Sequence, residues 1–206
     1  MVATDEMRDR LERRGFERIA RWSRGVDAEL FQPAPRDASL TGRPIFLYVG
    51  RVAVEKSIAR FLELDLPGTK WIVGDGPART SLQARFPSAV FHGTKQGRDL
   101  AWYYQQADAF VFPSRTDTFG LVLIEAMGCG TPIAAYPVTG PIDVVRNSAV
   151  GVLSHDLRDA ALKALSLDRV VVRDYALRFS WATATHQFVD HLHVRNAGGN
   201  TAPAAA

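Results

Sequence analysis

Two basic residues follow the first strongly apolar segment of the sequence, residues 44–50. Arg51 and Lys56 lie five residues apart, in a loop that leads into a helical pattern. Arginine forms paired hydrogen bonds with phosphate, and lysine adds a compact positive charge. This spacing suits two cations that hold a diphosphate between them. The alternative is a pair of ordinary surface charges, and these two residues alone do not decide between the two interpretations.

A glycine-rich turn, Gly74-Asp75-Gly76-Pro77, ends the second apolar segment. Glycine allows the backbone to approach a ligand closely, and a helix N-terminus is predicted just beyond the turn. The turn is not the dinucleotide-binding fingerprint, because G-x-G-x-x-G requires glycine at the position of Arg79. A tight turn without a ligand is the alternative.

Glu125 is the most unusual of the residues that could do chemistry in the segment 114–127. Its neighbours within residues 122–127 are all apolar, so it lies on a helical pattern that is apolar nearly all round. Such a helix is expected to be buried, and a buried carboxylate without a partner is costly. One interpretation is a carboxylate that accepts two hydrogen bonds from a vicinal diol such as ribose. The alternative is an arginine or lysine partner in the core, or a polar edge open to water.

Asp117 lies eight residues before Glu125. If both belong to one helix, its rise separates the carboxylates by about 10 Å along the axis, roughly the span between the two sugars of a nucleotide-diphosphate sugar. Thr118 is the predicted N-cap. The N–H groups of residues 119–121 are expected to face an anion, which the helix dipole favours. Gly120 would cost this helix about 1 kcal/mol relative to alanine.

The elements that must position these residues alternate along the chain. Short apolar segments bounded by turn residues are typical of strands buried on both faces, and helical patterns separate them. Strands are expected at 44–50, 70–74, 89–93, 109–113, 132–136 and 150–153, and helices at 57–64, 79–86, 99–107, 119–127 and, in two or three segments, 156–192. This order predicts the α/β class, with a single Rossmann-like, doubly wound parallel sheet flanked by helices. Ligands then bind beyond the carboxyl ends of the strands.

The N-terminal part is predicted to contain a helix at residues 4–14 capped by Thr4, a strand at 16–22 and a turn at 25–27. Its basic residues between 8 and 24 form either a solvated helix face or a surface for acidic lipid headgroups. The first twenty residues are rich in charge, so no signal-peptide core is expected. We therefore expect a cytoplasmic protein, with peripheral contact at the inner face of the membrane as the further alternative.

Composition excludes several classes of protein. The formal net charge of +3 is too small for broad, non-specific contacts with nucleic acid. The single cysteine excludes a disulfide framework, and Cys129 is interpreted as a small buried residue at a helix end. No metal-ligand cluster and no Asp-x-Asp pair occurs in the sequence, so no metal is expected.

Together these segments resemble the C-terminal donor-binding domain of retaining, GT-B-fold glycosyltransferases of family 4, also called glycosyl transferases group 1. The motifs are Arg51 with Lys56, the turn at residues 74–77, and residues 114–132 (SRTDTFGLVLIEAMGCGTP). In addition, residues 25–33 resemble the segment that enters this domain, and Ser180 with Trp181 resembles the start of its closing helix. The resemblance covers about residues 4–193 in the family's order.

The resemblance implies roles for individual residues. Arg51 and Lys56 would contact the diphosphate and Glu125 the ribose hydroxyls. Asp117 takes the first position of the family's E-x7-E pair, toward the donor sugar, and would act in catalysis with Arg51 and Lys56. The implied donor site comprises Gly50, Arg51, Lys56, Gly74, Gly76, Thr94, Lys95, Asp117, Phe119, Gly120, Leu121 and Glu125, with Thr94 and Lys95 at the nucleobase edge. Asp117 is one methylene shorter than the usual glutamate, and Ser57 stands where glycine or asparagine is usual.

The resemblance also implies an organisation. Residues 1–40 would enter from an N-terminal acceptor domain that is missing here, 41–179 would form the nucleotide-sugar-binding half of a GT-B fold, 180–195 the closing helix and 196–206 a disordered tail.

The implied function is retaining transfer of a hexosyl group from a UDP- or GDP-sugar to a sugar or lipid acceptor, without a cofactor. The isolated chain would be inactive. The alternatives are a nucleotide- or nucleotide-sugar-binding module without catalysis, and a Rossmann-type dehydrogenase or epimerase, which the missing G-x-G-x-x-G disfavours.

Overall fold

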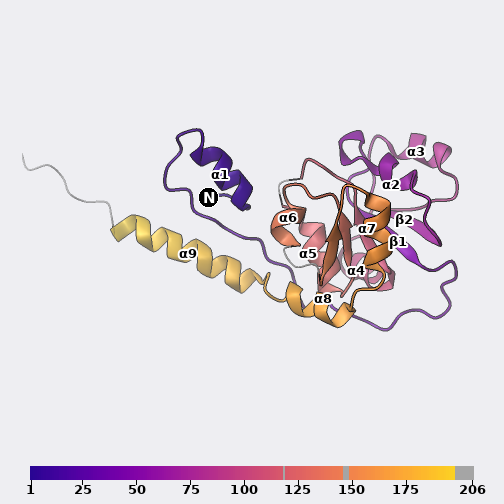
Figure 1. Cartoon of the computed structure of the whole chain (residues 1–206). Coiled ribbons are helices and arrows are strands. Elements are labelled where there is room, and N and C mark those ends of the chain that lie inside the picture. The colour runs from indigo at the N-terminus through magenta and orange to yellow at the C-terminus, as the bar shows by residue number, and fades with distance from the viewer. Residues whose placement is uncertain (118, 146–148, 198–206) are drawn as a thin grey trace, which may run out of the picture.

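The computed structural model describes residues 1–117, 119–145 and 149–197, with side-chain surroundings up to residue 192 (Figure 1). In these ranges one sheet of six parallel strands has the order β3-β2-β1-β4-β5-β6. The strands are β1 Ile45–Val49, β2 Thr69–Val73, β3 Val90–Gly93, β4 Ala109–Phe112, β5 Ile133–Ala135 and β6 Gly151–Leu153. Each falls inside or within one residue of a segment predicted to be a strand.

The central strands are apolar because both of their faces are buried. All five residues of β1 are buried, and their side chains alternate between two cores. Ile45, Leu47 and Val49 belong to one core, whereas Phe46 and Tyr48 belong to the other. This is the alternation expected of a strand with helices on both sides.

Helices cover both faces of the sheet. The helices are α1 Asp5–Glu12, α2 Ile58–Leu62, α3 Arg79–Arg85, α4 Gly97–Gln106, α5 Leu121–Gly128, α6 Pro141–Val144, α7 Leu157–Ala164, α8 Arg169–Ala176 and α9 Trp181–Ala197, with a short 3₁₀ turn, η1, at Val54–Lys56. Buried residues of α4, α5 and α8 join the first core, and those of α2, α3 and α7 join the second. The predicted fold class is confirmed.

Two arginines of α8 fix the C-terminal end of α5. Arg173 donates hydrogen bonds to the carbonyl oxygens of Gly128 (2.8 Å) and Phe31 (2.6 Å), and Arg169 donates to that of Cys129 (3.2 Å). The last carbonyl groups of a helix have no partner within the helix. The guanidinium groups therefore satisfy them and anchor α5, whose other end faces the carboxyl edge of the sheet.

The N-terminal segment differs from prediction. Helix α1 forms with Thr4 as its N-cap, and the Thr4 hydroxyl accepts a hydrogen bond from the N–H of Met7 (3.4 Å). The predicted strand at residues 16–22 is wrong, because within the described residues this segment makes only one bridge, between Val2 and Arg21. Its last two residues, Arg21 and Trp22, lie beside α9 instead: the Trp22 indole N–H donates to the carbonyl oxygen of Ala184 (3.0 Å), and Nε2 of His191 lies 3.0 Å from the carbonyl oxygen of Arg21.

Helix α9 extends away from the α/β body (Figure 1). It spans the predicted closing helix and ends at Ala197, and residues 198–206 of the predicted tail lie outside the described residues. No described helix is long and apolar enough to cross a bilayer.

Candidate functional site

A pocket of about 270 Å³ lies at the carboxyl ends of β1, β2 and β3. Its lining residues are Val49, Gly50, Arg51, Val73, Gly74, Asp75, Thr94 and Lys95. Five of them, Gly50, Arg51, Gly74, Thr94 and Lys95, are among the site residues named from the sequence. They meet because the three strands are parallel neighbours, so the loops that follow them share one edge of the sheet.

The loops after β1 and β2 are joined by backbone hydrogen bonds. The N–H of Gly50 donates to the carbonyl oxygen of Val73 (3.0 Å), and the N–H of Val52 donates to that of Asp75 (2.8 Å). Gly74 has φ +132°, and a Cβ built on it would overlap the carbonyl oxygen of Gly50. The sequence suggested that this glycine lets the backbone approach a ligand. In the structure it lets one loop pack against the other.

The two cations that follow β1 form ion pairs with different carboxylates. Arg51 is 63% exposed and pairs with Glu55. Lys56 reaches across to the loop after β4, where its Nζ lies 2.6 Å from Oδ1 of Asp117. Ser57 has φ +55°, the left-handed conformation that glycine and asparagine adopt most readily. This explains why the family pattern expects one of those residues there.

The start of α5 corrects the prediction for residues 119–127. The helix begins at Leu121, with Gly120 as its N-cap at φ +81°. Glycine is therefore favoured at position 120, and the expected cost of a glycine inside a helix does not apply. Of the three predicted N–H donors only Leu121 belongs to the helix, while Gly120 caps it and Phe119 precedes it. Thr118, the predicted N-cap, lies outside the described residues.

Asp117 precedes the helix, so its separation from Glu125 does not follow from helix rise. The expected distance of about 10 Å, which assumed one helix, has no basis in this structure. Asp117 is held by Lys56, and its Oδ2 atom is buried without a hydrogen-bond partner among the described residues. The carboxylate therefore has one oxygen engaged and one with unused capacity to accept.

Glu125 finds a partner that the sequence analysis did not consider. The Tyr104 hydroxyl donates a hydrogen bond to Glu125 Oε2 at 2.8 Å, and Tyr104 is fully buried in α4. Burial raises the pKa of Glu125, and the hydrogen bond from Tyr104 opposes that rise. Tyr104 lies within residues 99–107, which the sequence predicts to be a helix, and the prediction gives this residue no functional role. The signal available was that a buried tyrosine hydroxyl usually needs a partner.

The Glu125→Gln variant should keep its fold and lose about 1.5–3 kcal/mol of nucleotide binding, the scale for hydrogen bonds to charged groups. A carboxyl whose pKa is raised on folding contributes stability at low pH and loses it as the pH rises through that pKa. Glutamine avoids this loss, so its melting temperature at neutral pH should equal or exceed the wild-type value. Calorimetric titration and thermal melts measure both effects.

The matched control is Glu63→Gln, an exposed carboxylate paired with Arg85. The control should bind nucleotide as the wild type does. If Glu125→Gln binds normally and melts at a lower temperature, Glu125 is a structural residue.

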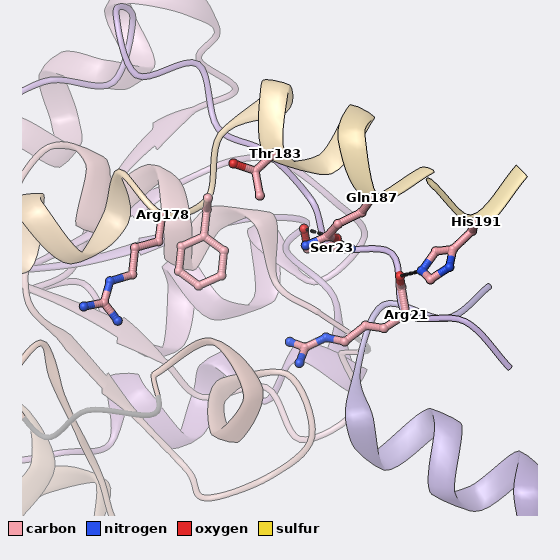
Figure 2. Close-up of a pocket in the computed structure, with 7 residues that line it drawn as sticks. Arg21, Ser23, Arg178, Thr183, Gln187 and His191 are labelled. Carbon is pink, nitrogen blue, oxygen red and sulfur yellow. Dashed lines mark hydrogen bonds between the residues drawn. The ribbon is translucent and has the colours of Figure 1, made fainter. Parts of the chain in front are cut away.

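A second pocket, of about 400 Å³, lies between the N-terminal segment and α9 (Figure 2). Ser23 donates from its N–H (3.0 Å) and its hydroxyl (2.9 Å) to Oε1 of Gln187, and Nε2 of His191 lies 3.0 Å from the carbonyl oxygen of Arg21. This pocket could not be anticipated from the sequence, because residues 16–22 were predicted to form a strand with no role beside the C-terminal helix.

Comparisons with known proteins agree with this architecture. The family model for glycosyl transferases group 1 matches residues 43–167. The chain is 34% identical over 194 residues to a GDP-mannose-dependent alpha-mannosyltransferase of Mycobacterium tuberculosis (strain CDC 1551 / Oshkosh), covering 86% of this chain and 51% of that protein. It is 33% identical over 191 residues to the sulfoquinovosyl transferase SQD2 of Arabidopsis thaliana, covering 80% of this chain and 38% of that protein.

Among solved structures, sucrose-phosphate synthase from Thermosynechococcus elongatus superposes with a TM-score of 0.77 at 25% identity, covering 96% of this chain and 58% of that one. Anabaena Alr3699/HepE in complex with UDP gives a TM-score of 0.76 at 18% identity, covering 94% and 63%, which is a likeness of fold. The chain spans about half the length of the curated relative from M. tuberculosis and 38% of the plant one. With more than half of its length matched by the family model, the chain belongs to the glycosyl transferases group 1 family.

Proposed function

We propose that this chain is the nucleotide-sugar-binding half of a retaining GT-B glycosyltransferase of family 4, which transfers a hexosyl group from a UDP- or GDP-sugar. The observation that carries the proposal is the pocket at the ends of β1, β2 and β3, whose lining includes Arg51 from the segment after β1 that also supplies Lys56 to its pair with Asp117. The named activity of the mannosyltransferase relative and the UDP bound to Alr3699/HepE support a donor of this class.

In the proposed complex, the nucleoside occupies the pocket, with Thr94 and Lys95 at the base. The Lys95 ammonium lies 5.8 Å from the ring centroid of Tyr103, so the base edge would meet a cation held on an aromatic face. The diphosphate lies against Arg51 and Lys56 and extends toward the N-terminus of α5, where the dipole favours an anion. Glu125 accepts hydrogen bonds from the ribose hydroxyls.

Lys56 must then serve two anions. In the free chain it neutralises Asp117, and in the complex we propose that it bridges Asp117 and the diphosphate. Asp117 would keep its lysine partner and use its unpartnered Oδ2 to accept from a hydroxyl of the donor sugar.

The proposed reaction proceeds on the front face of the sugar. The acceptor hydroxyl attacks the anomeric carbon on the side of the leaving diphosphate, and the diphosphate takes the proton of that hydroxyl. Arg51 and Lys56 stabilise the negative charge that develops on the diphosphate as its bond to the sugar breaks. Such a mechanism relies on positioning and electrostatic stabilisation, without a protein nucleophile.

No metal is required in this proposal, because the two cations and the start of α5 supply the positive charge. Nucleoside diphosphate affinity of the chain, measured by calorimetric titration, should be the same with EDTA and with added manganese. Affinity that disappears with EDTA and returns with manganese would contradict the metal-free assignment.

We further propose that the acceptor is bound by an N-terminal domain that is not among these residues. The chain alone should therefore bind the donor and transfer no sugar, because one wall of the cleft leaves the reacting groups open to water and weakens the electrostatic stabilisation. Mixing it with the N-terminal domain of a family member, labelled donor and sugar or lipid-linked acceptors should restore transfer. Transfer by the chain alone overturns this proposal, and binding without transfer in every mixture favours a binding module.

A further inference from the structure

The pocket beside α9 has the size of a ligand site. Its volume of about 400 Å³ falls in the range of roughly 300–1,000 Å³ that is typical of small-molecule pockets. Arg21 and Ser23 form one wall, and the link between α8 and α9 together with the first turns of α9 forms the other (Figure 2).

The charged groups that line this pocket are basic. Its lining includes Arg21 and Arg178 and no carboxylate. Arg21 shares its guanidinium with Asp5 at 2.9 Å. Arg178 makes no ion pair with any residue that the structure describes, and its guanidinium carbon lies 5.0 Å from the ring centroid of Tyr175. A guanidinium carries five N–H donors, so Arg178 keeps donors available for an anion.

The neutral groups of the pocket are suited to hydroxyl groups. Oε1 of Gln187 already accepts two hydrogen bonds from Ser23, which leaves the amide N–H groups of Gln187 as donors. Nε2 of His191 faces the carbonyl oxygen of Arg21 and must donate, because a carbonyl only accepts. Nδ1 of the neutral ring is then an acceptor. The lining thus offers donors and acceptors beside a cation.

The pocket adjoins the end of the proposed donor site. Phe179, which lines the pocket, packs edge-on against Phe119 with ring centroids 6.5 Å apart. Phe119 directly precedes Gly120, the N-cap of α5, where the diphosphate and sugar are expected. The Phe119–Phe179 contact therefore connects the pocket to the residue before the N-cap of α5.

We propose that this pocket binds a phosphorylated polyol and holds its phosphate group through Arg178 and, secondarily, Arg21. Phosphate matches the free guanidinium and the lack of a lining carboxylate, and polyol hydroxyls match Gln187 and His191. This ligand is separate from the sugar acceptor, which the proposed function assigns to the N-terminal domain, and its binding to the pocket does not depend on that proposed function.

The test uses the full chain with glycerol 3-phosphate as the probe, in the presence of saturating nucleoside diphosphate so that the donor site is filled. The wild type should bind glycerol 3-phosphate more tightly than glycerol or inorganic phosphate. Arg178→Gln should weaken binding about tenfold, the lower end for a charged hydrogen bond. Arg60→Gln, an exposed arginine on α2, is the control and should bind as the wild type does.

A second variant guards against a folding effect. Ser180 and Thr183 already form a hydrogen-bonded pair at the start of α9, so Thr183→Glu completes an S-x-x-E capping box and should preserve the helix. Its carboxylate should nevertheless repel the phosphate and weaken glycerol 3-phosphate binding at least as much as Arg178→Gln does, with an unchanged melting temperature.

A second experiment with lipid vesicles distinguishes a free polyol phosphate from a polyol phosphate in a lipid headgroup. Binding to phosphatidylcholine vesicles only when they contain phosphatidylglycerol, and its loss in Arg178→Gln, would support the pocket with a lipid headgroup as its ligand. The inference is overturned if the wild type binds neither glycerol 3-phosphate nor the phosphatidylglycerol vesicles. It is also overturned if Arg178→Gln and Arg60→Gln bind the same ligand equally well. If the chain binds no nucleotide but Arg178→Gln still weakens glycerol 3-phosphate binding, the proposed function is overturned and the inference about this pocket stands.

Discussion

Replacing Lys56 with methionine should weaken nucleoside diphosphate binding about 100-fold, or about 2.7 kcal/mol. The Lys56 side chain is only 23% exposed, and its Nζ lies 2.6 Å from Oδ1 of Asp117, which follows β4. Its removal takes away a cation that would contact the diphosphate. It also leaves the Asp117 carboxylate uncompensated beside the incoming negative charge. Calorimetric titration with UDP and GDP measures the change.

Lys163→Met is the matched control, because Lys163 also forms an ion pair, with Asp159 at 2.8 Å, but on the exposed surface of α7. Surface pairs of this kind contribute little, and the control should bind nucleotide as the wild type does. Equal affinity of the two variants would mean that Lys56 does not contact the diphosphate and that its pairing with Asp117 is only structural.

Gly74→Ala should lower the free energy of unfolding by about 3 kcal/mol and remove nucleotide binding. The new Cβ would overlap the carbonyl oxygen of Gly50, and alanine is strained at φ +132°. Because the loops after β1 and β2 form the pocket wall, relief of the overlap must displace Gly50 and the adjacent Arg51. Denaturant unfolding and nucleotide titration measure the two effects.

Gly97→Ala separates backbone strain from overlap. Gly97 also has a positive φ, +53°, but no atom lies within 4 Å of the built Cβ. This variant should lose about 1–2 kcal/mol from the left-handed backbone alone and keep wild-type affinity. Wild-type stability and affinity in Gly74→Ala would show that the close approach of the two loops is not needed.

The strands of the sheet could be predicted because a strand buried on both faces consists of consecutive apolar residues, which the local sequence shows directly. The continuous apolar run of β1 is fully buried, as is that of β4. Residues 16–22 also looked like a strand, but strand formation needs a neighbour to complete the hydrogen bonds. Among the described residues, no strand of the sheet lies beside residues 16–22. The local sequence pattern cannot show whether such a neighbouring strand exists.

The part of the site that could be predicted consists of residues in the loops that follow neighbouring parallel strands. Gly50, Gly74 and Thr94 meet at one edge because β1, β2 and β3 are neighbours. The specific pairings required the tertiary structure, since Lys56 and its partner are 61 residues apart and Glu125 and Tyr104 are 21 apart. These distances in sequence leave no periodic signal. The left-handed N-cap of α5 was missed because the segment was taken as a helix from its first apolar residue.

The pocket at the ends of β1, β2 and β3 is proposed to bind a nucleoside diphosphate. Backbone amide NMR spectra of the labelled chain, recorded during a titration with GDP or UDP, test it most directly. We expect saturable shifts at Gly50, Gly74, Thr94 and Leu121, with unchanged amides on α7 and in the pocket beside α9. Saturable shifts confined to other regions, or no shifts at any nucleotide concentration while the chain remains folded, would contradict it.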